Sequence, residues 1–333
     1  MLVGCQATTT DELTRMLAEL PGIGVVRLTE RDTSLATAQQ VQAAGAKSIV
    51  LCNNYGSLAA QVKAALALPG VSYAEVGNEP YWEGVPIASF AAEVYNLLVA
   101  LPAADRARVA VACMAGTSYT PSALLTAQPG LRGLITTLAC HPYDAYGTGP
   151  LGASGSGTPL KSGGQRYAET HAAWVKATGQ EVDVVVPEFG WCTRPYQPFS
   201  PPPASLPLVT EQQQHDYIAA AFADYASHPF VKAAVLYHYL GWDQPSTSLN
   251  LHNTPPFNGV VHWDYSRKPG WQALADAIRR FAPVPPFAPE KGLRTTTPDG
   301  QGTVAVVADS SHVVVALDDG AVRGYVTTEL RAA

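Results

Sequence analysis

Residues 73–82 of the chain read YAEVGNEPYW, an apolar run that ends in the triplet NEP at 78–80. A second run reads VVVPEFGW at residues 184–191 and places Glu188 at its end, as the first places Glu79. Near-continuous apolar runs of this length are typical of strands buried on both faces, as in a parallel sheet. Each run therefore predicts a buried strand that presents a glutamate where it opens into a loop.

The rest of the chain repeats this strand pattern, with helical segments between the strands. Strand candidates lie at residues 2–6, 24–28, 48–52, 73–77, 109–114, 134–140, 183–187 and 233–239. Segments with a helical apolar period lie at 33–44, 57–68, 88–101, 166–178, 211–227 and 271–281, with a shorter one at 121–128. A first helix is predicted after Thr9 and Glu12, which form a capping-box pair. Eight strand–helix units predict an α/β fold, a closed (β/α)8 TIM barrel, ahead of an open doubly wound sheet.

The C-terminal residues have a different pattern. The stretch PVPPFAP at 283–289 has the composition of a stiff linker. Beyond it, residues 303–308, 312–318 and 321–328 alternate, and an Asp-Gly pair at 319–320 is a hairpin signal. We expect a catalytic barrel over 1–282 and a three-stranded antiparallel β meander over 290–333. So small a sheet needs a support, and the barrel is the expected one.

Composition excludes several classes of protein. Of the 333 residues, 47% are hydrophobic and 14% are charged, which suits a large buried core. The net charge of −6 argues against a nucleic-acid partner. No apolar stretch is long enough for a membrane helix. The chain is expected to be a monomer. Because residues 1–5 have the pattern of a strand and not of a secretory signal, the compartment stays open: a mature secreted form, or a protein made without a signal.

The cysteines predict no metal or disulfide framework. The chain has 5 of them, an odd number, and none forms a C-x-x-C pair. Four lie in apolar strand-like runs, so we expect small buried thiols. His141, Asp144 and His238 can be drawn as a metal site, but their spacing matches no metal motif. The sequence predicts neither a metal nor a cofactor.

Glu79 and Glu188 have the placement that glycoside cleavage requires. Side chains at the carboxyl ends of barrel strands converge over the barrel axis, where catalytic groups of such folds lie. One carboxyl group must be protonated to deliver a proton to the leaving oxygen, and the other must be ionised at the anomeric carbon. A single Asn-Glu-Pro is equally compatible with a loop or helix-start glutamate. Two glutamates at the ends of the fourth and seventh strands favour the catalytic interpretation.

The triplets NEP at the end of strand four and EFG at the end of strand seven resemble those of clan A of the glycoside hydrolases, the "4/7" barrels. The resemblance covers residues 1–282 and is specific to the clan, not to one family in it. It implies a retaining mechanism, with Glu79 as general acid/base and Glu188 as nucleophile. The two carboxyl groups are then expected about 5–5.5 Å apart.

The resemblance also implies roles for substrate-binding residues. Asn78 would bond the sugar 2-hydroxyl, and Trp242 would form the platform under the sugar. His141 and Tyr143 would bond the substrate and the nucleophile. Arg27, at the end of strand two, would hold the nucleophile ionised, although an ordinary salt bridge with Glu30 or Asp32 is an alternative.

Further aromatic residues on the loop side suit the apolar faces of sugars. The candidates for substrate contact are Trp82, Trp191 and Tyr239, with Asn53, Asn54 and Tyr55 as weaker ones. Long loops at 147–165 and 194–208 favour a walled cleft and endo action on a β-linked poly- or oligosaccharide. A transglycosylase using the same site and a catalytically inactive carbohydrate-binding barrel remain alternatives.

Overall fold

The computed structural model describes residues 1–29, 33–143, 165–191, 193, 209–241 and 259–281, and in the C-terminal part residues 294–297, 300–307, 312–318, 321–326 and 331–332. The chain divides into two compact units, Met1–Ala282 and Pro283–Ala333. Each unit is described by itself. No described helix has the length and apolar character needed to cross a bilayer.

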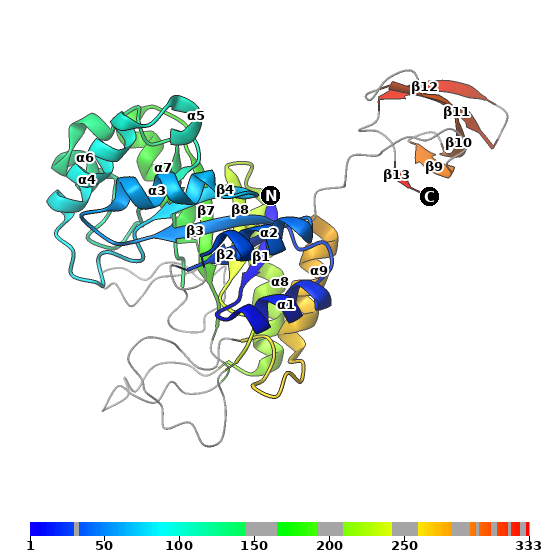
Figure 1. Cartoon of the computed structure of the whole chain (residues 1–333), viewed down its shortest axis with the longest axis horizontal. Helices are drawn as coiled ribbons and strands as arrows, with labels where there is room; N and C mark the ends of the chain where they lie inside the picture. The colour runs from blue at the N-terminus through cyan, green and yellow to red at the C-terminus, as the bar shows by residue number, and fades with distance from the viewer. Residues whose placement is uncertain are drawn as a thin grey trace. The chain divides into compact units, whose positions relative to one another are not determined.

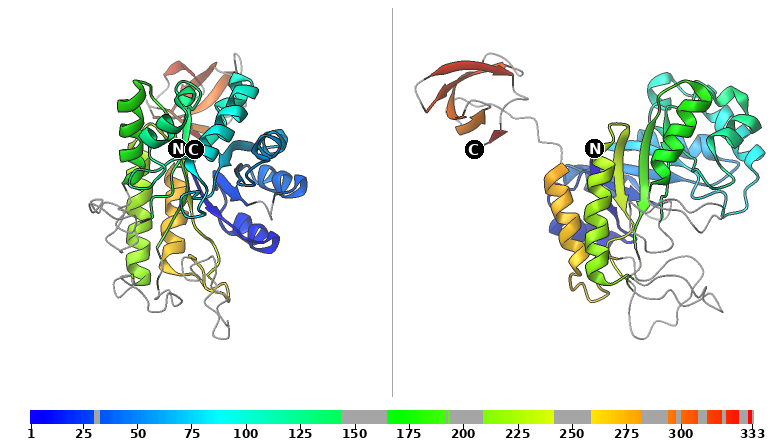
Figure 2. Two further views of the ribbon diagram at one scale, coloured as in Figure 1. Left: turned by 90° about the vertical axis from the view of Figure 1, so that its left-hand side faces the viewer. Right: turned by 180° about the vertical axis from the view of Figure 1, so that it is seen from behind.

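The first unit is a closed barrel of parallel strands surrounded by helices (Figures 1 and 2), as the sequence predicts. Its strands are β1 (Leu2–Gln6), β2 (Val25–Leu28), β3 (Lys47–Cys52), β4 (Val71–Val76), β5 (Val109–Ala112), β6 (Thr137–Ala139), β7 (Asp183–Phe189) and β8 (Val231–Leu236). They pair in sequence order, and β8 closes the barrel against β1. All carboxyl ends therefore meet at one mouth.

Helices follow the strands in the order that the periodicity predicts. They are α1 (Thr10–Glu19), α2 (Leu35–Ala43), α3 (Leu58–Ala67), α4 (Ile87–Ala100), α5 (Ala103–Arg106), α6 (Pro121–Ala127), the 3-10 turn η1 (Pro129–Leu131), α7 (Arg166–Thr178), α8 (Glu211–Ser227) and α9 (Pro269–Phe281). The predicted strand at 134–140 shortens to β6, because the amides of Leu134 and Ile135 bond back to the Leu131 carbonyl. The four-residue helix α5 is too short to show a period.

The N-terminus of α1 forms its predicted cap in part. The Thr9 hydroxyl accepts a hydrogen bond from the Glu12 amide at 3.2 Å. The Glu12 carboxylate accepts from the amide and hydroxyl of Thr8 at 2.6 and 2.7 Å, and not from Thr9 as in a full capping box. Glu12 is thus a buried carboxylate that is satisfied within the α1 entrance.

Two apolar layers hold the barrel. Small and β-branched side chains fill its interior, namely Val25, Ile49, Ala110, Ala139, Val185, Ala233 and Val235. A larger cluster lies between the strands and the helices and includes Phe90, Trp174 and Phe222. Cys5, Cys52, Cys113 and Cys140 are buried free thiols, which confirms their predicted burial. Cys192 lies outside the described residues.

At Gly4 the backbones of β1 and β2 lie too close together for a side chain. A Cβ atom at this position would lie 1.7 Å from the carbonyl oxygen of Val25. The backbone cannot yield there without breaking the barrel register, so Gly4→Ala is expected to destabilise folding by at least about 4 kcal/mol. Thermal unfolding and soluble yield measure this effect. Gly45→Ala is the control, since no atom lies within 4 Å of its added Cβ; equal stability loss in both variants would contradict the prediction.

The second unit is an antiparallel sheet with five strands, where the sequence predicts three. The strands are β9 (Arg294–Thr297), β10 (Gly300–Val307), β11 (His312–Leu317), β12 (Val322–Val326) and β13 (Arg331–Ala332), in the order β12-β11-β10-β9-β13. The prediction missed β9 because its sequence, RTTT, has no apolar residue, and β13 because it has two residues. The linker at 283–289 lies outside the described residues, and packing of this sheet on the barrel stays a prediction.

Candidate active site

Glu79 reaches the barrel mouth through an unusual turn after β4. Gly77 has φ +91°, and a Cβ there would approach the Phe90 ring at 3.0 Å and Ala112 at 3.2 Å. Glu79 itself has φ 51°, in the left-handed region that non-glycine residues rarely adopt. Its carbonyl accepts the amide of Trp82 at 2.7 Å, which closes the turn. Backbone strain of this kind concentrates at functional sites.

Glu188 is the penultimate residue of β7 and is held from two sides. The Tyr143 hydroxyl donates to its Oε2 at 2.8 Å. The Arg27 guanidinium donates through Nη1 to its Oε1. Both contacts fix the orientation of the carboxylate, since each supplies a hydrogen-bond donor and Arg27 adds a positive charge. The predicted partnership of Arg27 with Glu188 is thus present, while Glu30 and Asp32 lie outside the described residues.

Arg27 is the centre of a buried network, with 1% of its surface exposed. Its Nε and Nη2 donate to the two oxygens of Glu75 at 2.6 and 2.9 Å. Its Nη1 also donates to Gln6 Oε1 at 2.9 Å, and its Nη2 donates to Asn78 Oδ1 at 3.0 Å. Every edge of the guanidinium is therefore occupied, which fixes its plane toward Glu188.

The prediction missed Glu75, although it lies in the same strand as the predicted residues. Its carboxylate is fully buried under the barrel mouth. Burial alone would raise its pKa, but Arg27 and His141 outweigh it and lower the pKa. A charged residue inside an apolar strand was the available signal, because such a group is buried only when paired.

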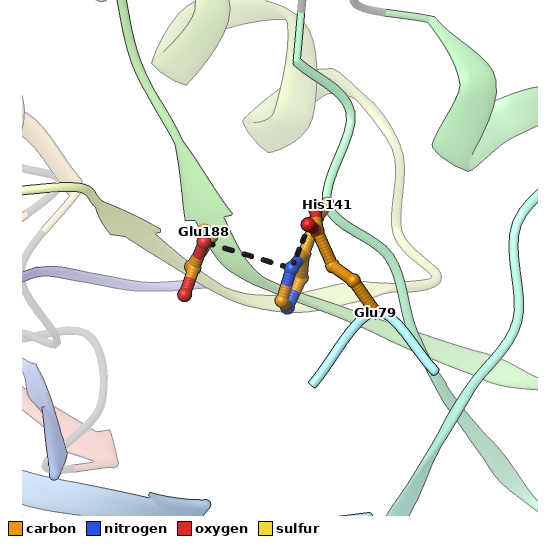
Figure 3. Close-up of side chains that lie close together, drawn as sticks. All are labelled: Glu79, His141 and Glu188. Atoms are coloured by element: carbon orange, nitrogen blue, oxygen red, sulfur yellow. Dashed lines mark hydrogen bonds and ion pairs between the residues drawn. The ribbon is translucent and has the colours of Figure 1, made fainter. Parts of the chain in front are cut away.

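His141 connects this buried network to both glutamates at the mouth (Figure 3). Its Nε2 lies 2.9 Å from Glu75, and its Nδ1 lies 3.2 Å from Glu79 Oε1 and 3.6 Å from Glu188 Oε2. Burial lowers the pKa of His141, but Glu188, Glu75 and Glu79 outweigh burial and raise it to about 10. The imidazole is therefore a cation at neutral pH and donates from both nitrogens.

Three ligand-type atoms of Glu79, His141 and Glu188 lie within 4.8 Å of one another. That spacing also occurs in metal sites. Here the same atoms already contact one another, and the guanidinium of Arg27 beside Glu188 disfavours a further cation. The arrangement is suited to proton transfer and to attack by a carboxylate on a group held between the two glutamates.

The predicted aromatic residues divide into two groups. Trp82 is 57% exposed beside Tyr81, with their rings 5.8 Å apart, on the loop that carries Glu79. Trp191 is buried and packs against Phe189 and Tyr217. Trp242 lies outside the described residues. The structure thus places Trp82 on the loop that carries Glu79 and keeps Trp191 in the core.

Tyr239 does not join the site either. It is buried, and its hydroxyl lies toward Glu19 and Arg15 of α1, outside the barrel. Tyr239 follows β8 (Val231–Leu236), and its hydroxyl faces α1 and not the two glutamates. Tyr237 was missed: it is buried and lies near Tyr143, which is half-buried. Tyr81 was not assigned a role, yet it is half-buried close to Glu79 and Glu188.

The weaker candidates for substrate contact, Asn53, Asn54 and Tyr55, lie in the loop after β3 and form hydrogen bonds within the protein. The Tyr55 hydroxyl donates to Glu83 at 3.1 Å, and the Asn53 amide approaches the same carboxylate at 3.5 Å. The Asn54 amide donates to Gln61. These contacts tie the loop after β3 to the turn that carries Trp82.

The chain thus has a (β/α)8 barrel with one glutamate in the turn after β4 and one near the end of β7. Its structure is similar to a family 39 glycoside hydrolase from Bacteroides cellulosilyticus WH2, with a TM-score of 0.56 and 16% identity over 96% of this chain and 69% of the other. It is also similar to a family 128 endo-β-1,3-glucanase from Amycolatopsis mediterranei, with a TM-score of 0.55 and 14% identity over 83% and 98% of the two chains.

A β-glucuronidase from Ruminococcus gnavus has a TM-score of 0.51 and 14% identity over 83% of this chain. The matched region is 48% of that enzyme, so this chain spans about half its length. Similarity at these identities shows the shared fold. No protein-family sequence model matches the chain, and no curated protein matches it by sequence.

Proposed function

We propose that this protein is a retaining glycoside hydrolase that cleaves a β-linked poly- or oligosaccharide by double displacement. Glu79 is its general acid/base and Glu188 its nucleophile. The observation that carries the proposal is the short distance between the two carboxyl groups. A carboxylate oxygen of Glu79 lies within 4.8 Å of a carboxylate oxygen of Glu188. Retaining enzymes have close carboxyl groups, whereas inverting enzymes leave about 6.5–9.5 Å for a water molecule.

The surroundings of the two glutamates support different roles. Glu188 receives hydrogen bonds from Arg27 and Tyr143, and its side chain is 12% exposed. Those donors stabilise an anion that is aimed at the anomeric carbon. Glu79 is 24% exposed and contacts His141, so its carboxyl group is free to meet the glycosidic oxygen. Asn78, fixed by Arg27, stands next to the acid/base as a hydroxyl-binding residue.

The test is the stereochemistry of the first product. Proton NMR of a digest in progress shows the β anomer first if the enzyme retains configuration. A panel of β-1,3-glucan, β-1,4-glucan, mannan, xylan and acidic glycans, assayed for reducing ends, identifies the substrate. Early appearance of the α anomer would overturn the retaining assignment. Absence of cleavage across the panel, with glycan binding by calorimetry, would favour the inactive carbohydrate-binding barrel.

Two observations support endo action. The structural match covers 98% of the family 128 endo-β-1,3-glucanase, which is therefore an enzyme of about the size of this barrel. Trp82 presents an exposed indole on the loop that carries Glu79, as an apolar surface for a further unit of a long glycan. Mass spectrometry of the products distinguishes internal cleavage from release of terminal units. Products longer than the substrate would instead indicate a transglycosylase.

Trp82→Ala is expected to raise KM by about threefold to tenfold on a polysaccharide while kcat stays within about twofold. The exposed ring lies outside the proton-transfer network, so its contribution is binding of a sugar face. Steady-state kinetics on long and short substrates measure the effect, which should disappear on a disaccharide. Trp82→Phe is the matched control that keeps an aromatic face. A fall in kcat with unchanged KM would contradict this role.

A further inference from the structure

His141 has a position that the proposed roles of the two glutamates leave unexplained. Its Nδ1 faces Glu79 Oε1 at 3.2 Å and Glu188 Oε2 at 3.6 Å, so one N–H lies between both carboxylates. Its other nitrogen is fixed by Glu75 at 2.9 Å. A small change of ring angle is enough to move the Nδ1 hydrogen bond from one glutamate to the other.

The charges around the imidazole restrict what it can do. The ionisable groups that face it are Glu75 and Glu79 from β4 and its loop, and Glu188 from β7. Arg27 donates to Glu188 Oε1 and to Glu75, and Tyr143 donates to Glu188 Oε2, the oxygen that His141 also faces. Within the part of the chain that the structure describes, His141 is the one cationic side chain in contact with Glu79.

Double displacement moves a negative charge between the same two glutamates. In the first step the Glu188 carboxylate bonds to the anomeric carbon, the carbon–oxygen bond to the leaving group breaks, and the Glu79 proton passes to that oxygen. Glu188 becomes a neutral ester and Glu79 an anion. In the second step Glu79 takes a proton from water, whose oxygen bonds to the anomeric carbon, and the Glu188 carboxylate is released.

We propose that His141, oriented by Glu75, alternates its Nδ1 hydrogen bond between Glu79, its partner in this structure, and Glu188 as the negative charge moves between them. This role rests on the proposed retaining function. Arg27 stays with Glu188 throughout, because Glu75, Gln6 and Asn78 fix its guanidinium. Glu79 therefore obtains its stabilising donor in the glycosyl-enzyme from His141. Glu75 is a positioning residue that prevents the ring from turning away.

Two substitutions separate the charge of His141 from its geometry. The side chain of His141→Gln reaches Glu75 but presents no donor at the Nδ1 position. His141→Asn places an amide N–H near Nδ1 without the charge. Kinetics are measured with 2,4-dinitrophenyl β-glycosides of glucose, galactose, xylose and glucuronic acid, using the one that the unsubstituted protein cleaves. The dinitrophenolate leaving group needs no proton from Glu79, so the first step is fast. The rate constant kcat then reports the second step, hydrolysis of the glycosyl-enzyme.

The expected result is a fall of about tenfold to a hundredfold in kcat for His141→Gln, with a smaller fall in kcat/KM and a larger burst of dinitrophenolate. His141→Asn should recover part of that loss. The acidic limb of kcat should move to higher pH in both variants. Glu12→Gln, which also changes a buried carboxyl group but lies outside the site, serves as a control for general damage to the fold.

Equal losses in kcat and kcat/KM, without a larger burst, would overturn the proposal and leave His141 as a support of Glu188 alone. A rise in KM alone would assign it to substrate binding and overturn the proposal too. The retaining function is tested separately on the unsubstituted protein, by intact mass after incubation with the 2-deoxy-2-fluoro glycosyl fluorides of the same sugars. Failure to form an adduct there would contradict the retaining mechanism itself, before any variant is compared.

Discussion

Glu188→Ala is expected to lower kcat by at least about 10⁴-fold, while the barrel keeps its fold. Without this carboxylate no covalent glycosyl-enzyme forms, and Arg27 and Tyr143 face an empty position. Glu79→Ala is expected to cost about 10²–10⁴-fold on substrates with poor leaving groups and little on 2,4-dinitrophenyl glycosides in their first step. Steady-state assays on both substrate types measure the difference.

Azide distinguishes the two roles by its product. In Glu188→Ala it enters the space of the lost nucleophile and gives an α-glycosyl azide from a β-glycoside. In Glu79→Ala it attacks the glycosyl-enzyme in place of water and gives a β-glycosyl azide. Glu83→Gln, a change in a carboxylate of the same loop that bonds Tyr55, is the control. The reverse pattern of products would exchange the assigned roles, and full activity of Glu188→Ala would reject the site.

The sequence predicts the parts of this site that depend on strand order. Glu79 and Glu188 end strands that a closed barrel must bring to one mouth, so their convergence follows from topology alone. Arg27, His141 and Tyr143 follow in the same way from β2 and β6. Arg27 and Glu188 are 161 residues apart along the chain, yet the barrel needs no further information to join them.

Sequence reasoning failed where the direction of a side chain decides the outcome. Tyr239 and Trp191 lie near the ends of their strands, but one points to α1 and the other packs on Phe189. Glu75 was missed although a charged residue inside a buried apolar strand requires a partner, because the sequence alone does not identify that partner. A single sequence gives the spacing of residues but not which side of each strand end faces the axis.

Arg27→Met is expected to lower the free energy of unfolding by about 3–5 kcal/mol at pH 7. Methionine fills much of the same volume but leaves the buried carboxylate of Glu75 without its bidentate partner. In the intact protein the folded state has a lowered Glu75 pKa, so this group adds stability above its ordinary pKa and loses that contribution as the pH falls. In the variant, burial dominates and raises the Glu75 pKa, so the stability difference should shrink on acidification. Urea unfolding at pH 7 and pH 5 measures it.

A second substitution separates the structural role of Arg27 from its effect on the reaction. Arg27→Met combined with Glu75→Leu removes both buried charges and should recover much of the lost stability, because a buried ion pair can be replaced by apolar groups at little cost. Activity should stay low, since Glu188 still lacks the guanidinium that donates to it and orients it. Recovery of activity together with stability would mean that Arg27 acts through the fold alone. Stability that does not recover would place the defect in packing around Gln6 and Asn78, and not in the unpaired charge.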